Sequence, residues 1–176
     1  MPSIEVQYYQ TNLGELILGS FENQLCLCDW RYRKQRKQID DRITHGLGAT
    51  FIVTESEIIE ETKNQLTEYF SKKKEAFSIP ILQVGTSFQK KVWNSLLQIP
   101  YGTTETYLEL SKRIGNVKAI RAVAAANGAN ALSIIIPCHR VVGTKGELVG
   151  YAGGLYAKKA LLSLEDSKND NQLRLF

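Results

Sequence analysis

The chain has 176 residues, of which 43% are hydrophobic and 23% charged, an ordinary composition for a globular protein. This length suffices for one medium core or two small ones, and the composition argues against a disordered chain. No apolar run approaches the roughly 18 residues of a membrane span, and the N-terminus lacks the basic and apolar regions of a signal peptide. Three cysteines favour a reducing compartment over a disulfide framework. We therefore expect a cytoplasmic protein without membrane contact.

The formal net charge of +4 is unevenly distributed. Residues 1–86 hold 10 lysines and arginines against 12 acidic residues, whereas residues 87–165 hold 10 against 4, a net charge of +6. A basic segment suits a polyanionic partner such as nucleic acid, because neutralising phosphates releases counterions. Taken alone, the charge is explained more simply by a solubilising surface.

Three short strands are predicted at the start of the chain. They are "IEVQYYQ", "ELILGS" and "QLCLCDW", separated by "TNLG" and "FEN", which is the pattern of an antiparallel meander. One helix over about residues 58–70 and a final short strand follow. The basic run Arg31–Lys37 is interpreted as a solvated connection. Cys26 and Cys28 are interpreted as buried hydrophobic residues, and no metal is expected, because a tetrahedral zinc site would lack its fourth ligand.

The sequence changes from predicted strands to predicted helices at about residue 86. A helix capped by Thr86 or Ser87 comes first. Thr106 and Glu109 form a capping box for a second helix, for which Gly115 is a plausible C-cap. The alanine-rich "NVKAIRAVAAANGAN" predicts a third helix. Two helices joined by a short turn outline a DNA-binding helix-turn-helix, although a helical hairpin packed in a core has the same outline.

Two features of the alanine-rich helix favour DNA binding. Its small side chains would let the backbone approach a nucleic acid closely, and Arg121 would project from an otherwise neutral surface. The segment "SIIIPCHRVVG" then places Cys138 directly before His139, one of only two histidines in the chain. A buried cysteine is usually inert, whereas a reactive one needs a basic or cationic neighbour. We therefore interpret Cys138 and His139 as a reactive pair.

The ordered series "RAVAAANGAN", "IPCHRVVG" and "GYAGGLYAKKALLSLE" resembles the active-site region of the O6-alkylguanine-DNA alkyltransferases, over about residues 86–165. The segment "TNLGELILGS" resembles the first domain of that family more weakly. With the predicted elements, the resemblance implies an α+β fold. It would comprise a small N-terminal α/β domain with antiparallel strands (1–85), a mostly helical, winged-helix-like domain with the helix-turn-helix (86–165) and a flexible tail (166–176).

The resemblance also implies an activity, the direct reversal of DNA damage. Cys138 would accept an alkyl group from O6-alkylguanine, or also O4-alkylthymine, in a stoichiometric and irreversible transfer without a cofactor. His139 would deprotonate Cys138 through a bridging water and would be oriented by Glu165. Asn130 would brace the turn before the active-site segment. Tyr107 would donate a proton towards the guanine or press on its rotated phosphate.

An alkylated base inside a duplex cannot be attacked in line, so the nucleotide must be flipped out, at a cost of a few kcal/mol. The resemblance implies that Arg121 fills the gap left in the stack. A guanidinium suits this place, because it can stack on the orphaned base among the phosphates. Ala119, Ala122 and Arg140 complete the predicted DNA contact. The pocket for the flipped base is assigned to Val141, Val142, Tyr151, Gly153 and Gly154.

Two other classes of function use some of the same residues. A cysteine hydrolase would employ Cys138, His139 and a carboxylate such as Glu165 over many turnovers, but would leave the helix-turn-helix without a role. A non-repairing module that only binds alkylated DNA would have no use for Cys138. The ordered motifs favour the alkyltransferase interpretation over both.

The tail ends in Gln172, Leu173, Arg174, Leu175 and Phe176. This pentapeptide resembles the Q-L-[S/D]-L-F peptide by which bacterial DNA polymerases and repair proteins dock on the sliding clamp, and departs from it at Arg174. The resemblance implies a second partner besides double-stranded DNA, the clamp, which would hold Leu175 and Phe176 as apolar anchors. The protein itself is expected to be a monomer. The alternative is that these apolar side chains fold back onto the protein's own surface.

Overall fold

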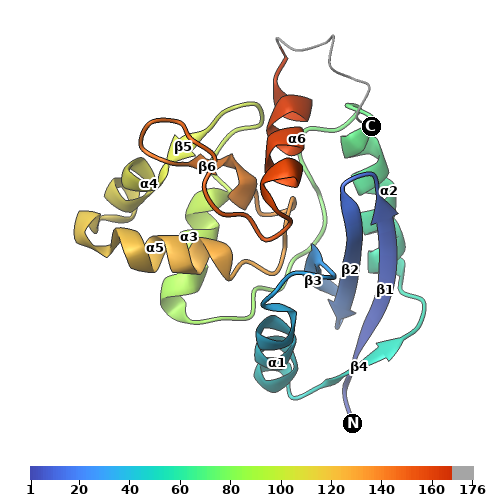
Figure 1. Ribbon diagram of the computed structural model, residues 1–176. Helices are drawn as coiled ribbons and strands as arrows, with labels where there is room; N and C mark the ends of the chain where they lie inside the picture. The colour runs from blue at the N-terminus through green and yellow to red at the C-terminus, as the bar shows by residue number, and fades with distance from the viewer. Residues whose placement is uncertain (168–176) are drawn as a thin grey trace. The chain divides into compact units, whose positions relative to one another are not determined.

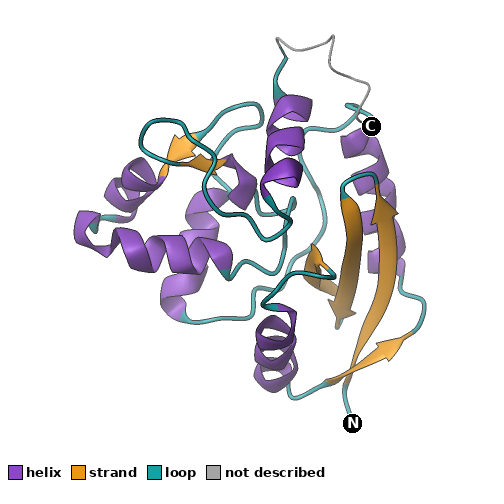
Figure 2. Ribbon diagram, viewed as in Figure 1, coloured by secondary structure: helices purple, strands orange, loops and turns teal. Residues whose placement is uncertain are grey.

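The computed structural model describes residues 1–167, which form two compact units, Met1–Gly85 and a unit that begins at Thr86 (Figure 1). The long strands all belong to the first unit, and the second is built mainly from helices (Figure 2). The expected α+β class is confirmed, with antiparallel strands first and helices second. None of the helices within residues 1–167 combines the length and apolar character needed to cross a membrane.

The first unit is organised around a four-stranded sheet. Its strands are β1 (Ser3–Thr11), β2 (Gly14–Phe21), β3 (Gln24–Trp30) and β4 (Thr50–Val53), in the order β3-β2-β1-β4. The first three pair antiparallel, which confirms the predicted meander. β4 was not predicted, and it pairs parallel with β1 at the edge of the sheet.

Helix α1 (Arg36–Leu47) was also not predicted. The carboxylate of Asp29, fully buried in β3, forms ion pairs of 3.0 Å with Arg33 and 2.9 Å with Arg36. A buried carboxylate needs such partners, because an unpaired charge is strongly disfavoured away from water. The interpretation of Arg31–Lys37 as a solvated connection is therefore wrong for Arg33 and Arg36, which are partners of a buried charge.

Helix α2 (Glu57–Phe70) confirms the predicted helix and packs on the sheet. The hydroxyl of Ser56 caps it by accepting a hydrogen bond of 3.4 Å from the backbone of Ile59. Beyond the helix, Ile81 forms a single bridge to Leu25 in place of the predicted final strand.

Cys26 and Cys28 lie in β3 and are buried, as expected for small apolar residues. Burial raises the pKa of the Cys26 thiol to about 12, and it raises that of Cys28 as well. Both therefore stay protonated at neutral pH. Within residues 1–167, three or more His, Cys, Asp or Glu side chains do not come together in a group that could hold a metal ion.

The second unit begins with α3 (Ser87–Leu96) and α4 (Tyr107–Ile114). Both helices have the expected N-terminal caps, each a complete capping box: Thr86 with Gln89, and Thr106 with Glu109. Gly115 ends α4 in the left-handed conformation, with φ of 88°, which confirms the predicted C-cap.

Helix α5 (Ile120–Gly128) follows α4 through a turn and the short 3-10 helix η1 (Val117–Ala119). The two helices pack against each other, an arrangement compatible with the predicted helix-turn-helix. The indole nitrogen of Trp93, in α3, donates a hydrogen bond of 2.8 Å to the carbonyl of Ala126, in α5. This buried bond fixes α3 to the helix that carries Arg121.

After α5 the chain becomes irregular and buried. It forms the 3-10 helix η2 (Cys138–Arg140) and the two-residue strand β6 (Val141–Val142), which pairs parallel with β5 (Glu105–Thr106). A loop then leads to the last helix, α6 (Leu155–Glu165), which packs on η2. The element that carries Cys138 therefore packs on α6 and α3 and leads into the strand that pairs with β5.

Candidate active site

Cys138 is the first residue of η2 and is only 4% exposed. Asn130 braces the chain before it: its side-chain amide donates to the carbonyl of Ile136 (3.0 Å), and its side-chain oxygen accepts from the backbone of Leu132 (3.0 Å). In the same segment, Ile134 has φ of 73°, a conformation that a β-branched residue rarely adopts. These contacts fix the tight turn that presents Cys138.

His139 is fully buried, and its Nε2 lies 2.8 Å from Oε1 of Glu165. Burial would raise the pKa of Glu165, but hydrogen bonds from His139 and Arg140 outweigh burial and lower the pKa to about 2. Glu165 is therefore a carboxylate, which can only accept, so the proton of a neutral His139 must sit on Nε2.

The other ring nitrogen of His139 is consequently a proton acceptor. This Nδ1 is buried and has no hydrogen-bond partner within residues 1–167. Burial lowers the pKa of His139, more than its contact with Glu165 raises it. The imidazole is thus neutral at physiological pH, with a basic lone pair on Nδ1. This is the state that a general base requires.

Arg140 does not lie where a DNA-contacting residue is expected. Its guanidinium is buried and donates to Glu165 through Nε (2.9 Å) and Nη2 (2.8 Å), and to the carbonyl of Ile99 through Nη1 (2.7 Å). The prediction of Arg140 as a DNA contact is therefore at odds with the structure, because the guanidinium is engaged inside the unit. The apolar residues around Arg140 in the sequence were a signal of its burial, and a buried arginine needs a carboxylate partner.

Tyr107, the first residue of α4, accepts a hydrogen bond of 3.3 Å at its hydroxyl from the side chain of Asn127. Burial raises the pKa of the phenol, and a negative charge on Cys138 would raise it further. Tyr107 is therefore a neutral hydroxyl close enough to Cys138 to interact with it electrostatically. Asn127 was not predicted as a site residue.

Lys158, in α6, is a second residue that the sequence interpretation missed. Its side chain is completely buried. Its ammonium donates hydrogen bonds to the carbonyls of Val149 (2.9 Å) and Gly150 (3.2 Å). Burial lowers its pKa, and Cys138 opposes that shift.

The residues assigned to the base pocket divide into two groups. Val141 and Val142 are buried in β6, whereas Tyr151 and Gly153 are half-buried and Gly154 is exposed. The ring of Tyr151 meets that of His139 edge-on, with centroids 6.5 Å apart. Within the assigned set, Tyr151 is thus a residue whose ring packs against that of His139.

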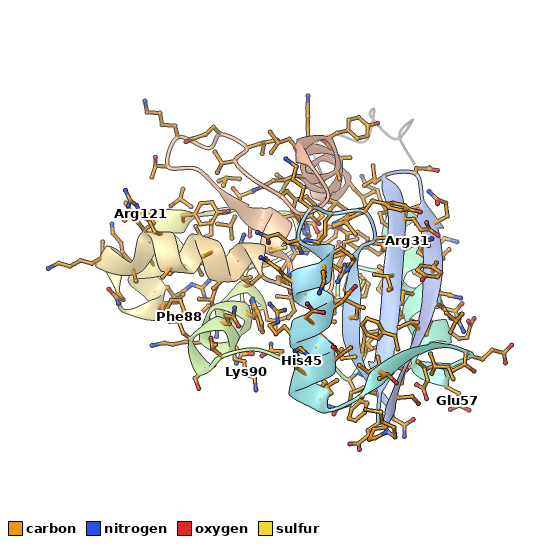
Figure 3. All side chains as sticks on the ribbon, turned by 60° about the horizontal axis from the view of Figure 1, so that its bottom comes forward. Arg31, His45, Glu57, Phe88, Lys90 and Arg121 are labelled. Atoms are coloured by element: carbon orange, nitrogen blue, oxygen red, sulfur yellow. The ribbon has the colours of Figure 1, made fainter. Side chains whose placement is uncertain are left out.

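The residues assigned to DNA lie on the outside of the second unit, Arg140 excepted. Arg121 and Ala122 are exposed in the first turn of α5, and Ala119 is partly exposed just before it. Figure 3 shows Arg121 at the surface of this unit. The assigned clamp-binding residues of the tail, Gln172 to Phe176, lie outside the described residues.

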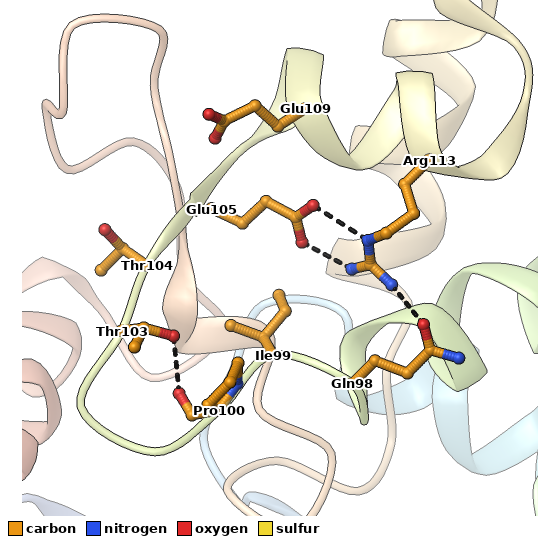
Figure 4. Close-up of a pocket in the computed structure, with 8 residues that line it drawn as sticks. All are labelled: Gln98, Ile99, Pro100, Thr103, Thr104, Glu105, Glu109 and Arg113. Carbon is orange, nitrogen blue, oxygen red and sulfur yellow. Dashed lines mark hydrogen bonds and ion pairs between the residues drawn. The ribbon is translucent and has the colours of Figure 1, made fainter.

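A pocket of about 440 Å³ opens in the second unit, and its lining residues do not include Cys138 (Figure 4). Arg113 is one of the lining residues. It forms an ion pair with Glu105 and donates a hydrogen bond of 2.8 Å to the side chain of Gln98. These groups satisfy one another and join the segment just after α3 to β5 and α4. The remaining lining residues are Ile99, Pro100, Thr103, Thr104 and Glu109.

Comparison with known proteins covers both units. Residues 4–83 match the model described as "6-O-methylguanine DNA methyltransferase, ribonuclease-like domain", and residues 87–167 match "6-O-methylguanine DNA methyltransferase, DNA binding domain". A methylated-DNA–protein-cysteine methyltransferase of Methanosarcina acetivorans is 40% identical over 90% of this chain and 96% of its own. The constitutive enzyme of that name from Bacillus subtilis is 38% identical over 89% and 93%.

Solved structures give the same relationship. The O6-methylguanine methyltransferase of Mycobacterium tuberculosis has a TM-score of 0.78 and 35% identity, over 100% of this chain and 99% of its own. A structure of the M. tuberculosis protein OGT in complex with DNA has a TM-score of 0.79 and 34% identity, over 99% of both chains. Both halves of the sequence and the ordered motifs around Cys138 thus lead to one conclusion: the chain belongs to the methylated-DNA–protein-cysteine methyltransferase family.

Proposed function

We propose that this protein repairs DNA by moving an alkyl group from O6 of guanine to Cys138, once per molecule. The family and the names of its relatives support the reaction type. One observation carries the proposal for this chain: buried Cys138 is followed by a neutral histidine whose Nδ1 is free to accept a proton while Nε2 is held by Glu165. A thiol in apolar surroundings needs such a base to become a nucleophile.

The transfer is a displacement at carbon. His139 takes the thiol proton through a bridging water, and the thiolate sulfur forms a bond to the alkyl carbon. The bond between that carbon and O6 breaks, and its electron pair leaves with the guanine. Tyr107, a neutral phenol, would give a proton to the departing base. The thioether that remains has no leaving group for water to displace, so each molecule acts once.

Glu165 and Arg140 support His139 in its role as the general base. The positive charge that develops on His139 is stabilised by the carboxylate at 2.8 Å. Arg140 binds both oxygens of that carboxylate and thereby fixes its orientation. Asn130 has the corresponding role for Cys138, because it holds the turn that precedes the thiol.

DNA is the proposed partner, as it is for the M. tuberculosis OGT in its DNA complex. The net charge of +6 between residues 87 and 165 suits a phosphate backbone. Exposed Arg121, at the start of α5, is proposed to enter the duplex and fill the place of the flipped nucleotide. Cys138, at 4% exposure, can react only with a base that has left the stack.

Intact mass spectrometry tests this function. The protein is mixed with an excess of duplex DNA containing O6-methylguanine, and we expect a mass gain of one methyl group per molecule, with no further gain after a second addition of DNA. Repaired DNA in excess over an unmodified protein would contradict the proposal and would favour a hydrolase. Bound but unrepaired DNA would favour a non-repairing module.

Three further proposals rest on the sequence. The tail residues Gln172, Leu173, Leu175 and Phe176 would dock on a bacterial sliding clamp, and the protein would act as a cytoplasmic monomer. Binding of the intact chain to immobilised clamp, compared with a chain that ends at Asn171, tests the first. Equal binding by both chains, or binding by neither, would refute it without affecting the repair proposal.

A further inference from the structure

Lys158 occupies an unusual position for a lysine. Its side chain is completely buried in α6, although a lysine pays a large desolvation cost for burial. The mechanism proposed above gives it no task. Its ammonium has two partners in the described structure, the carbonyl oxygens of Val149 and Gly150, and both of these residues are exposed. A buried charge therefore holds a stretch of surface backbone.

The stretch that Lys158 holds leads directly into the active site. Gly150 has φ of 45°, and the next residue, Tyr151, places its ring edge-on against His139. Tyr151 in turn accepts a hydrogen bond of 3.0 Å from the backbone of Gly154, immediately before α6. The segment Val149–Gly154 is thus attached to α6 at both of its ends. Gly154 leads directly into the helix, and the carbonyls of Val149 and Gly150 accept hydrogen bonds from Lys158 within the helix.

We propose that Lys158 is a positioning residue of the transfer reaction: by binding the carbonyls of Val149 and Gly150 it holds Tyr151 against His139 and so shapes the pocket that receives the alkylated base. Lys158 does not touch the base. This inference rests on the proposed function and adds to it the means by which one wall of the pocket is kept in place.

The polar groups near Cys138 have other hydrogen-bond partners. Tyr107 is bonded to Asn127, and His139 and Arg140 are bonded to Glu165. None of these bonds reaches residues 149–151. Without the ammonium of Lys158, the carbonyls of Val149 and Gly150 would lose their hydrogen-bond donor. Water can reach these exposed residues and would take its place, but water would not hold the segment against α6. Hydrogen bonds to a charged group contribute enough free energy that their loss changes an equilibrium constant by about tenfold or more.

The test measures single-turnover transfer from the free base O6-benzylguanine, over a range of concentrations, in the full chain. Lys158→Met keeps the apolar stem and removes the ammonium. We expect the half-saturating concentration of the base to rise about tenfold or more. Lys159→Met, which changes the exposed neighbour on the same helix, is the matched control and should leave it unchanged.

A second variant breaks the same contact from the other side and leaves the core intact. Gly150→Pro forces φ from 45° to about −65° at an exposed residue, which turns the carbonyls away while Lys158 keeps its charge. It should raise the half-saturating concentration in the same way, and it decides the matter if Lys158→Met does not fold.

Two outcomes overturn the proposal. If Lys158→Met, or Gly150→Pro in its place, lowers only the maximal rate and leaves the half-saturating concentration unchanged, the pocket does not depend on this contact. A rise equally large in Lys159→Met would show a general effect of the helix. Failure of the unmodified protein to react with the base or with alkylated DNA would instead refute the proposed function, and this inference with it.

Discussion

The ion pair between Glu165 and Arg140 should be a major source of stability in the second unit. Both side chains are buried, and the carboxylate accepts two hydrogen bonds from the guanidinium and one from His139. Glu165→Gln keeps the shape of the side chain, but removes the charge and turns an amide group towards Arg140. Breaking one partner of a buried pair leaves the other charge uncompensated, so we expect a loss of roughly 3 kcal/mol in the free energy of unfolding.

The pKa of Glu165 leads to a similar magnitude independently. Its decrease from the ordinary value of 4.5 to about 2 corresponds to roughly 3 kcal/mol. Because the pKa is lower in the folded protein, this stabilisation is complete above about pH 4.5 and is lost as the pH falls through about 2. The difference in stability between the wild type and Glu165→Gln should therefore shrink between pH 5 and pH 2.

Urea unfolding followed by circular dichroism, at several pH values in this range, measures both effects. Glu147→Gln is the matched control, because Glu147 is exposed in the same unit and its carboxylate accepts one hydrogen bond from the backbone of Lys145. It should cost less than about 0.5 kcal/mol. A loss below about 1 kcal/mol in Glu165→Gln, or a loss that does not change with pH, would refute the reasoning.

Three further predictions concern other parts of the chain. Arg121→Ala should slow transfer from duplex DNA and leave the reaction with free O6-benzylguanine unchanged; equal slowing of both, in parallel rate measurements, would disprove its role in the stack. Burial raises the pKa of Cys26 to about 12 and that of Cys28 also, so iodoacetamide at pH 7 should modify Cys138 before either, as peptide mass mapping can check. Trp93→Phe removes the buried bond to Ala126 and should cost about 1–3 kcal/mol in urea unfolding, whereas an unchanged midpoint would mean that the bond adds nothing.

Local signals in the sequence were sufficient for much of the second unit. The cap at Thr86, the capping box at Thr106 and the left-handed Gly115 depend on residues within one helical turn, so their pattern can be read directly. The turn between β2 and β3 is equally local. The prediction that Cys138 and His139 act together also started from a local signal, because the two are neighbours in the chain.

The missed features depend on partners far away in the sequence. β4 pairs with β1, about 47 residues earlier, and α1 has only Ile39 and Ile43 buried, with no side-chain cap at its start. Arg140 resembles a DNA contact until Glu165, 25 residues later, supplies its buried partner. Lys158 belongs to the same class, since a lysine in sequence indicates a solvated surface unless its acceptors are known. A charged residue in the sequence does not by itself show whether its side chain is buried.

The central claim is that the methyl group ends on the sulfur of Cys138. Duplex DNA carrying an isotopically labelled methyl group on O6 of guanine, mixed with the wild type and with Cys138→Ala, tests it most directly, with fragmentation mass spectrometry to locate the label. We predict one label per wild-type molecule, on Cys138, and none on Cys138→Ala, which should still bind the duplex. Label on any other residue, or label released to solvent while Cys138 stays unmodified, would contradict the account.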